Sequence, residues 1–292
     1  MRRISIVDAP SVLGLFPRGV ETLPEALLAH DLVGRLGATV HRSLTPPAYS
    51  PEPDPTGINN ADALVTFAEI LADAVGAEID DGAFPLVLGG DCSIVFGPLL
   101  ALARRGRSGL LFLDGHADFA HPADDPSGEA ASMDLALATG RGPQGFGPIG
   151  GYRPLVTDDR VALLAYRVRD DGTDRHLDLR VEDSAITTID LTELRRRGLE
   201  ASISEAMATV ARDDLDGFWI HLDADVLDDE LMPAVDYRAP GGLSWDELTA
   251  VVRAALGSGG ARGLDLTIFN PRLDPDGSLA ERLVAFLVDA VS

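Results

Sequence analysis

Short apolar runs alternate along the chain with longer segments in which apolar residues recur at helical spacing. The short runs predict buried parallel strands over residues 4–7, 86–88, 110–113, 161–166, 185–189, 218–222 and 263–268. The longer segments predict helices over residues 24–36, 61–77, 94–104, 130–138, 191–197, 203–212, 244–256 and 278–291. Such an alternation is typical of a doubly wound α/β fold, in which helices cover both faces of a parallel sheet.

The boundaries of this pattern come from local signals. Ser244 opens a Ser-Trp-Asp-Glu sequence, the capping-box pattern that predicts the first turn of a helix. Residues 45–60 and 141–155 are rich in proline and glycine, which predicts long loops of the kind that often carry function. No linker-like change in composition and no internal repeat divides the chain. We therefore expect a single domain over residues 1–292.

Composition narrows the classes of function. The chain has 292 residues, 46% of them hydrophobic, so it can bury a large core. Its formal net charge of −23 argues against nucleic acid or an anionic membrane as a partner. No run of 18 or more apolar residues is present, and the single cysteine rules out an intramolecular disulfide. These features predict a soluble cytoplasmic protein.

Acidic segments follow three of the predicted strands directly. Gly89-Gly90-Asp91-Cys92-Ser93 follows the strand at 86–88, and Asp114-Gly115-His116-Ala117-Asp118 follows the strand at 110–113. Asp223-Ala224-Asp225 follows the strand at 218–222. The carboxyl ends of parallel strands meet at the crevice where open α/β sheets bind ligands. We therefore expect these side chains to lie close together.

The spacing of the acids favours a metal site. Asp114, His116 and Asp118 stand at i, i+2 and i+4, which on an extended strand end places all three on one side. Asp223 and Asp225 repeat the i, i+2 spacing. A single Asp at a strand end is better explained as a helix cap or an Asx turn. Five acid or imidazole groups in two such sets instead favour a divalent cation such as Mn²⁺, and they are enough for two ions. Two metals that share carboxylates lower the pKa of a water molecule for attack near neutral pH.

These motifs resemble those of the arginase/ureohydrolase family. The resemblance rests on the segments above, on Gly241-Gly242-Leu243-Ser244 and on the sequence from Asp265 to Pro271, with Pro17–Glu21 and Tyr166-Arg167 as further matches in the same order. It spans nearly the whole chain. It implies a three-layer α/β/α sandwich around a mostly parallel sheet of about eight strands. It also implies hydrolysis of a C–N bond of a guanidino-type small molecule at a binuclear Mn²⁺ site.

The resemblance assigns the metal ligands by position. One ion would be held by Cys92, Asp114, Asp118 and Asp223, and the other by Asp114, His116, Asp223 and Asp225. Cys92 departs from the family, which has a His ligand there. A lone Cys is usually a small buried hydrophobic residue, but at a ligand position we favour a metal–sulfur role. A thiolate is a competent ligand for softer ions, so Zn²⁺ or Fe²⁺ is an alternative to Mn²⁺.

Two further departures concern catalysis. Arginases carry a proton-shuttling His where this chain has Ala131, and His121 is the nearest imidazole that would substitute; a surface loop His is an equally good interpretation. The family usually has a Glu two residues before Asn-Pro, whereas this chain has Ile268. That change removes a charge-assisted contact to a guanidinium.

The substrate-binding residues are also assigned by resemblance. Ser127 matches a family serine that helps bind an amino-acid carboxylate. Asp170 lies near the family position that binds the α-amino group, with a solvated surface acid as the alternative. Family members are commonly homo-oligomers, which we expect here too.

One branch of the family fits this combination best. The hydrolase of D-cycloserine biosynthesis that converts N-omega-hydroxy-L-arginine to ornithine and hydroxyurea also has a Cys at that ligand position. A hydroxyguanidine is less basic than a guanidine and needs the missing carboxylate less. In this hypothesis Asp118 serves as general base and then as general acid. The alternatives are another ureohydrolase of the agmatinase, formimidoylglutamase or guanidino-acid hydrolase type, and a non-catalytic metal-binding family member.

Overall fold

A single parallel sheet organises the chain in the computed structural model, which describes residues 2–52, 54–168 and 180–291. The strands are β1 (Ile4–Asp8), β2 (Val40–Ser43), β3 (Phe84–Leu88), β4 (Ser108–Leu113), β5 (Val161–Leu164), β6 (Thr187–Ile189), β7 (Gly217–Asp223) and β8 (Ala261–Thr267). They form one eight-stranded sheet in the order β2-β1-β3-β8-β7-β4-β5-β6. Every pair of neighbouring strands is parallel.

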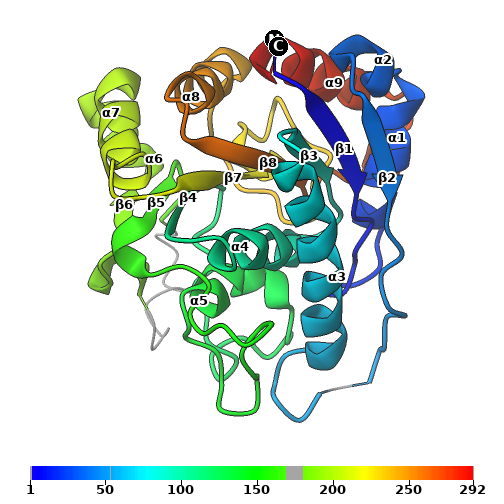
Figure 1. The fold of residues 1–292 in the computed structure, drawn as a ribbon, viewed down its shortest axis with the longest axis vertical. Coiled ribbons are helices and arrows are strands. Elements are labelled where there is room, and N and C mark those ends of the chain that lie inside the picture. Colours follow the sequence, from blue (N-terminus) through cyan, green and yellow to red (C-terminus); the bar gives the residue numbers. More distant parts are fainter. Residues whose placement is uncertain (1, 53, 169–179, 292) are drawn as a thin grey trace.

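Helices cover both faces of this sheet (Figure 1). They are α1 (Leu23–Ala29), α2 (Leu32–Leu36), α3 (Ala61–Asp80), α4 (Phe96–Ala103), α5 (Asp134–Ala138), α6 (Leu191–Arg197), α7 (Leu199–Val210), α8 (Trp245–Gly257) and α9 (Ser278–Val291). One hydrophobic core contains buried side chains of α3, α4 and α5, and a second contains those of α1, α2 and α6 to α9. The predicted three-layer α/β/α sandwich is confirmed.

Strand β7 shows how the two cores divide one strand. Trp219 belongs to the core under α3 to α5, whereas Phe218 and Ile220 belong to the opposite core. Successive side chains of a strand alternate between faces. His221 and Asp223 therefore lie on the same face as Trp219, beneath α3 to α5.

The structure corrects several predicted boundaries. The helix expected over 24–36 is two helices, because Asp31 adopts a left-handed φ of 56° between α1 and α2. The strand expected over 161–166 ends at Leu164, where Ala165 turns to a φ of 73°. Strand β2 was missed, since Val40–Ser43 is a mostly exposed edge strand without an apolar run. The capping box at Ser244 is confirmed, with both of its hydrogen bonds present.

The long-loop prediction for 45–60 fits the gap between β2 and α3 in the sequence of elements. Among the described helices, none is both long and apolar enough to cross a lipid bilayer.

Candidate metal centre

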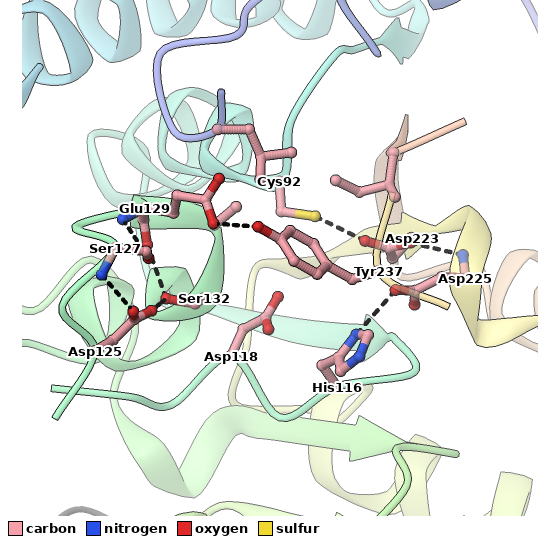
Figure 2. Close-up of a pocket in the computed structure, with 13 residues that line it drawn as sticks. Cys92, His116, Asp118, Asp125, Ser127, Glu129, Ser132, Asp223, Asp225 and Tyr237 are labelled. Carbon is pink, nitrogen blue, oxygen red and sulfur yellow. Dashed lines mark hydrogen bonds and ion pairs between the residues drawn. The ribbon is translucent and has the colours of Figure 1, made fainter. Parts of the chain in front are cut away.

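Polar side chains gather at the carboxyl ends of the four adjacent strands β3, β8, β7 and β4. Cys92 begins a short 3₁₀ turn after β3, Asp114 follows β4, and Asp223 ends β7. A pocket of about 290 Å³ opens at this edge of the sheet. Five of the six predicted ligands line it (Figure 2): Cys92, His116, Asp118, Asp223 and Asp225. The sixth, Asp114, is fully buried beside them.

Backbone amides orient the acidic side chains. The amide of His116 donates to Oδ1 of Asp114 over 2.6 Å, and the amide of Asp225 donates to Oδ1 of Asp223 over 2.7 Å. The amide of Gly115 donates to Oδ1 of Asp225 over 2.9 Å. Each i, i+2 pair therefore forms an Asx-type turn that fixes one carboxylate oxygen. Oδ2 of Asp114 is left without a hydrogen-bond partner among the described residues.

Asp114, His116 and Asp118 lie in or beside the pocket, but the extended strand end predicted from their spacing is wrong. Strand β4 ends at Leu113, so the three residues do not continue an extended strand. Asp118 instead has a left-handed φ of 44°. The side chains are brought together by a loop, not by the pleat of a strand.

His116 bridges the two acidic segments. Its Nδ1 lies 2.9 Å from Oδ2 of Asp225 and 3.8 Å from Oδ1 of Asp114. One ligand atom from each of these three residues lies within 4.8 Å of the others. This spacing is small enough for one cation to contact all three after slight adjustment, because metal–oxygen and metal–nitrogen bonds are about 2.0–2.2 Å long.

Burial and mutual repulsion perturb the acids strongly. Burial, followed by the charge of Asp225, raises the pKa of Asp114 from 3.8 to about 6. Burial also raises the pKa of Asp118 and of Asp223 well above the ordinary value, with neighbouring carboxylates as the next cause. Asp225 is the exception. Burial acts to raise its pKa, but the charge and hydrogen bond of His116, the charge of Arg167 and the hydrogen bond from the Gly115 amide together lower it. Carboxylates held this close need a cation to remain ionised together.

Cys92 lies in the middle of this charged region with only 1% of its surface exposed. Its thiol donates to Oδ2 of Asp223 over 2.8 Å, and its Sγ lies 3.4 Å from Oγ1 of Thr267. Burial and then the charge of Asp223 raise the pKa of the thiol well above its ordinary value. A cation at this position would have to displace the thiol proton, since thiolates bind metals and thiols do not.

The opposite wall of the pocket contains a chain of hydrogen-bonded residues, of which only Ser127 was predicted from the sequence. Tyr237 donates its hydroxyl proton to Oε2 of Glu129 over 2.6 Å (Figure 2), and Oε1 of Glu129 accepts from the amide of Phe16. The predicted residue Ser127 also lines the pocket, and its Oγ accepts from the amide of Glu129 over 3.1 Å. No spacing signal marks Glu129 or Tyr237 in the sequence, because they come from distant loops.

His121, another predicted site residue, lies outside this arrangement. His121 is half-buried in the loop after Asp118, where its Nδ1 accepts from the amide of Ala123 over 3.1 Å. It is not among the residues that line the pocket. Asp170 lies outside the described residues.

Ile268 gives the pocket an apolar side. Its side chain lines the cavity together with Leu15 and Ala131. Ile268 has a φ of 69°, which is strained for a β-branched residue. Its amide donates to the carbonyl oxygen of Gly90 over 2.8 Å and so ties the end of β8 to the turn after β3. The chain therefore has an apolar side chain at the position where the resemblance led us to look for a carboxylate.

The family follows from a comparison with known proteins. The model of the arginase family matches residues 6–291 of this chain. The chain belongs to the arginase family. It is therefore a hydrolase that acts on C–N bonds other than peptide bonds.

Individual relatives of this arginase-family protein are similar along almost their whole length. An arginase of Brevibacillus brevis is 31% identical over 294 residues, which cover 98% of this chain and 96% of the relative. An arginase of Staphylococcus aureus strain COL is 28% identical over 295 residues, with 98% and 96% coverage. The solved arginase of Bacillus caldovelox superposes with a TM-score of 0.88 at 28% identity, covering 99% of this chain and 98% of that structure.

The donor atoms of this arginase-family protein fit a pair of divalent metal ions. Asp114, His116 and Asp225 form an oxygen- and nitrogen-rich group that suits Mn²⁺. Cys92 and Asp118 belong to a second group that contains sulfur. The unpaired, fully buried Oδ2 of Asp114 is an acceptor that requires a cation or proton. The same region contains two buried groups that sequence reasoning did not single out, Asp134 and His221.

Arg167, part of the family motif, supports this centre from outside the pocket. Its guanidinium donates to the carbonyl oxygens of Asp225 over 2.6 Å and Leu227 over 2.8 Å. It also donates to the carbonyl oxygen of Gly241 over 2.5 Å. Arg167 thereby fixes the loop that carries Asp225 and contributes the positive charge that lowers the pKa of that carboxyl.

Proposed function

We propose that this protein hydrolyses the C–N bond of a guanidino-type small molecule, with N-omega-hydroxy-L-arginine as the leading substrate and ornithine and hydroxyurea as products. Six residues would hold two divalent ions: Cys92, Asp114, His116, Asp118, Asp223 and Asp225. The observation that carries the proposal is the convergence of these side chains at the carboxyl ends of adjacent strands. Two ions bound there supply Lewis acidity and lower the pKa of a water molecule.

Asp118 is the residue best suited to move a proton. Its carboxylate projects into the pocket (Figure 2), and burial followed by the charge of Asp114 raises its pKa well above the ordinary value. A carboxylate that faces the reacting groups can accept a proton from water and pass it to a departing nitrogen. We assign to Asp118 the transfer of a proton from water to the leaving group. His121, which does not line the pocket, is a second candidate for this role.

The apolar side of the pocket favours a less basic substrate. A guanidinium that lies against Ile268 finds no carboxylate there to accept its hydrogen bonds, and a buried unpaired cation is costly. A hydroxyguanidine, which is less strongly basic, loses less on entering the same space. This difference supports N-omega-hydroxy-L-arginine over arginine.

The amino-acid end of the substrate would lie against the other wall. Ser127 offers a hydroxyl group, and the carboxylate of Glu129 is held in place by Tyr237. A carboxylate and hydroxyl groups can recognise an α-amino and an α-carboxylate group. We therefore add Glu129 and Tyr237 to Ser127 as substrate-positioning residues and retain Asp170 as a predicted contact of the α-amino group.

Steady-state assays test the proposal. Purified protein loaded with Mn²⁺, and separately with Zn²⁺ or Fe²⁺, is assayed on N-omega-hydroxy-L-arginine, arginine, agmatine and formiminoglutamate. We expect the highest kcat/KM on N-omega-hydroxy-L-arginine. Preferential turnover of agmatine or formiminoglutamate would show that the proposed substrate is wrong, although hydrolysis of a C–N bond would remain the reaction. Less than one bound ion per chain after loading would contradict the two-metal mechanism.

A further inference from the structure

Three unpaired polar groups are buried beneath the pocket, beside the Cys92 sulfur. Both carboxylate oxygens of Asp134 and Nε2 of His221 lack a hydrogen-bond partner among the described residues, as does Oδ2 of Asp114. All three residues have 0% of their surface exposed. Leaving buried polar groups unpaired costs free energy, and buried carboxylates cost the most. Together these groups indicate that a cation belongs among them.

The Cys92 sulfur joins these groups into two sets of ligand atoms. Atoms of Cys92, Asp114 and His221 lie within 4.8 Å of one another, and so do atoms of Cys92, Asp118 and Asp134. Two ligands of one ion are separated by at most about 4.0–4.6 Å when the metal–ligand bonds are 2.0–2.3 Å long. Small side-chain rotations would therefore bring each set into contact with one ion.

His221 has the surroundings of a metal ligand. Its Nδ1 lies 2.5 Å from Oδ2 of Asp265, whose other oxygen accepts a hydrogen bond from the indole of Trp219. The imidazole also packs against Phe112, with ring centroids 4.4 Å apart. Metal-ligating histidines typically donate their second ring N–H to a carboxylate, which fixes the tautomer and the ring orientation. Here Asp265 accepts at Nδ1, so Nε2 is left as the nitrogen for a ligand.

Asp134 supplies a carboxylate to the second of these two sets. It is the first residue of α5, and its side chain makes no cap hydrogen bond there. Hydrogen bonding at the start of the helix therefore does not account for the buried carboxylate. A carboxylate that is fully buried, unpaired and within ligand distance of a thiol and a second carboxylate is positioned to bind a cation.

We propose that His221 and Asp134 are direct ligands of the ion held by Cys92. That half of the centre would be a mixed sulfur, nitrogen and oxygen site, which selects a borderline-soft divalent cation such as Zn²⁺ or Co²⁺ over Mn²⁺. The other half, around His116 and Asp225, would remain a site of hard ligands. This inference rests on the metal centre of the proposed function but adds two residues to it.

Co²⁺ is the probe that separates the roles. Metal-free protein is titrated with Co²⁺ and followed by the near-ultraviolet thiolate-to-cobalt charge-transfer band, the visible d–d bands and equilibrium dialysis. The wild-type chain should show the charge-transfer band, and Cys92→Ser should lose it. Asp134→Asn and His221→Gln should each weaken Co²⁺ binding at the thiolate site by at least about tenfold and shift the d–d bands.

A matched control is Asp8→Asn. Asp8 is also a buried carboxylate with an unpaired oxygen, but it lies at the end of β1 and belongs to none of the ligand groups. It should leave the cobalt spectrum and affinity unchanged. Thermal melts of the metal-free variants report folding, and Asp134→Asn should be at least as stable as wild type because it removes a buried unpaired carboxylate. It therefore serves as the test even if His221→Gln fails to fold.

The outcomes distinguish this inference from the proposed function. Wild-type affinity and wild-type d–d bands in Asp134→Asn, alongside a thiolate band that depends on Cys92, would overturn the inference and leave the two-metal hydrolase intact. A wild-type chain that binds Co²⁺ without any thiolate band would overturn the inference and the role of Cys92 together. Failure to bind Co²⁺ at all would overturn both proposals.

Discussion

The thiol of Cys92 donates a hydrogen bond to Oδ2 of Asp223 over 2.8 Å, so two predicted ligands share one proton at the centre of the pocket. This contact ties metal binding to proton release, because both groups must be deprotonated to bind an ion. The same hydrogen bond lets Cys92 stay a neutral thiol among the buried carboxylates.

Replacing Cys92 by His tests this relationship directly. An imidazole is neutral when it binds and is well suited to Mn²⁺ sites of the family type, so Cys92→His should bind Mn²⁺ more tightly and alter kcat. Metal content after dialysis and steady-state kinetics provide the measurement. Cys92→Ser, of similar size but a poorer ligand, is the control. Unchanged metal content and rate in Cys92→His would mean that Cys92 only fills space.

In the metal-free chain, Asp114 should contribute less to stability as pH rises toward neutrality. Burial raises the pKa of Asp114 from 3.8 to about 6, so the folded state binds more protons than the unfolded state between those values. The free energy of unfolding attributable to Asp114 therefore falls as pH rises through this window. As pH rises through this window, the melting temperature of EDTA-treated wild type should fall more than that of EDTA-treated Asp114→Asn.

Saturating Mn²⁺ should reverse this trend. The ion binds the deprotonated carboxylates, so the increase in Tm on adding Mn²⁺ should grow with pH over the same range. A metal-induced increase in Tm that is independent of pH between about 4 and 6 would show that the buried acids do not take part in binding.

Ile268 should control the preference between arginine and hydroxyarginine. Ile268→Glu places a carboxylate on the apolar side of the pocket and should raise the ratio of kcat/KM for arginine to that for N-omega-hydroxy-L-arginine by about tenfold or more. Ile268→Gln has nearly the same shape without the charge and should change the ratio much less. An identical ratio in wild type and Ile268→Glu would place the reacting group elsewhere in the pocket.

Gly115 should be required for the loop that carries the ligands. A Cβ at this position would lie 1.8 Å from Nη1 of Arg167 and 2.7 Å from the carbonyl oxygen of Asp225. Gly115→Ala should displace the guanidinium, lower the free energy of unfolding by about 1–3 kcal/mol and weaken Mn²⁺ binding. Gly257→Ala is the control, since a Cβ there meets nothing within 4 Å. Denaturant unfolding and metal titrations of both variants check the result.

Tyr237 should act on substrate affinity more than on the chemical step. Tyr237→Phe removes the hydrogen bond to Oε2 of Glu129 and leaves the carboxylate held by the Phe16 amide at Oε1, so it should raise KM severalfold with a smaller change in kcat. A fall in kcat at constant KM would instead assign Tyr237 a role in the reaction itself.

The sequence was sufficient for the fold where apolar runs were continuous. Strands β4 and β7 are buried along their whole length, and the acids that follow them could be placed at one edge of a parallel sheet. Edge strand β2 could not be predicted, because Val40–Ser43 forms its hydrogen bonds to β1 with mostly exposed side chains. The helix predicted over 24–36 is interrupted at Asp31 by the backbone conformation of that one residue, which no local sequence motif predicts.

The site was predictable to the extent that its residues are adjacent in sequence. Asp114 and Asp223 follow apolar strands and could be recognised, whereas the contact between Glu129 and Tyr237 joins loops 108 residues apart. His221 was hidden inside an apolar run, although it is paired with Asp265 on the neighbouring strand. Such pairings depend on strand order, which becomes visible only in the folded sheet.

We propose above all that this metal centre cleaves a guanidino-type C–N bond of N-omega-hydroxy-L-arginine. The most direct measurement is the steady-state rate at which Mn²⁺-loaded protein releases ornithine from N-omega-hydroxy-L-arginine and from arginine, each with and without EDTA. We expect EDTA-sensitive turnover with a higher kcat/KM for N-omega-hydroxy-L-arginine. No turnover of that compound above the rate for arginine would contradict it.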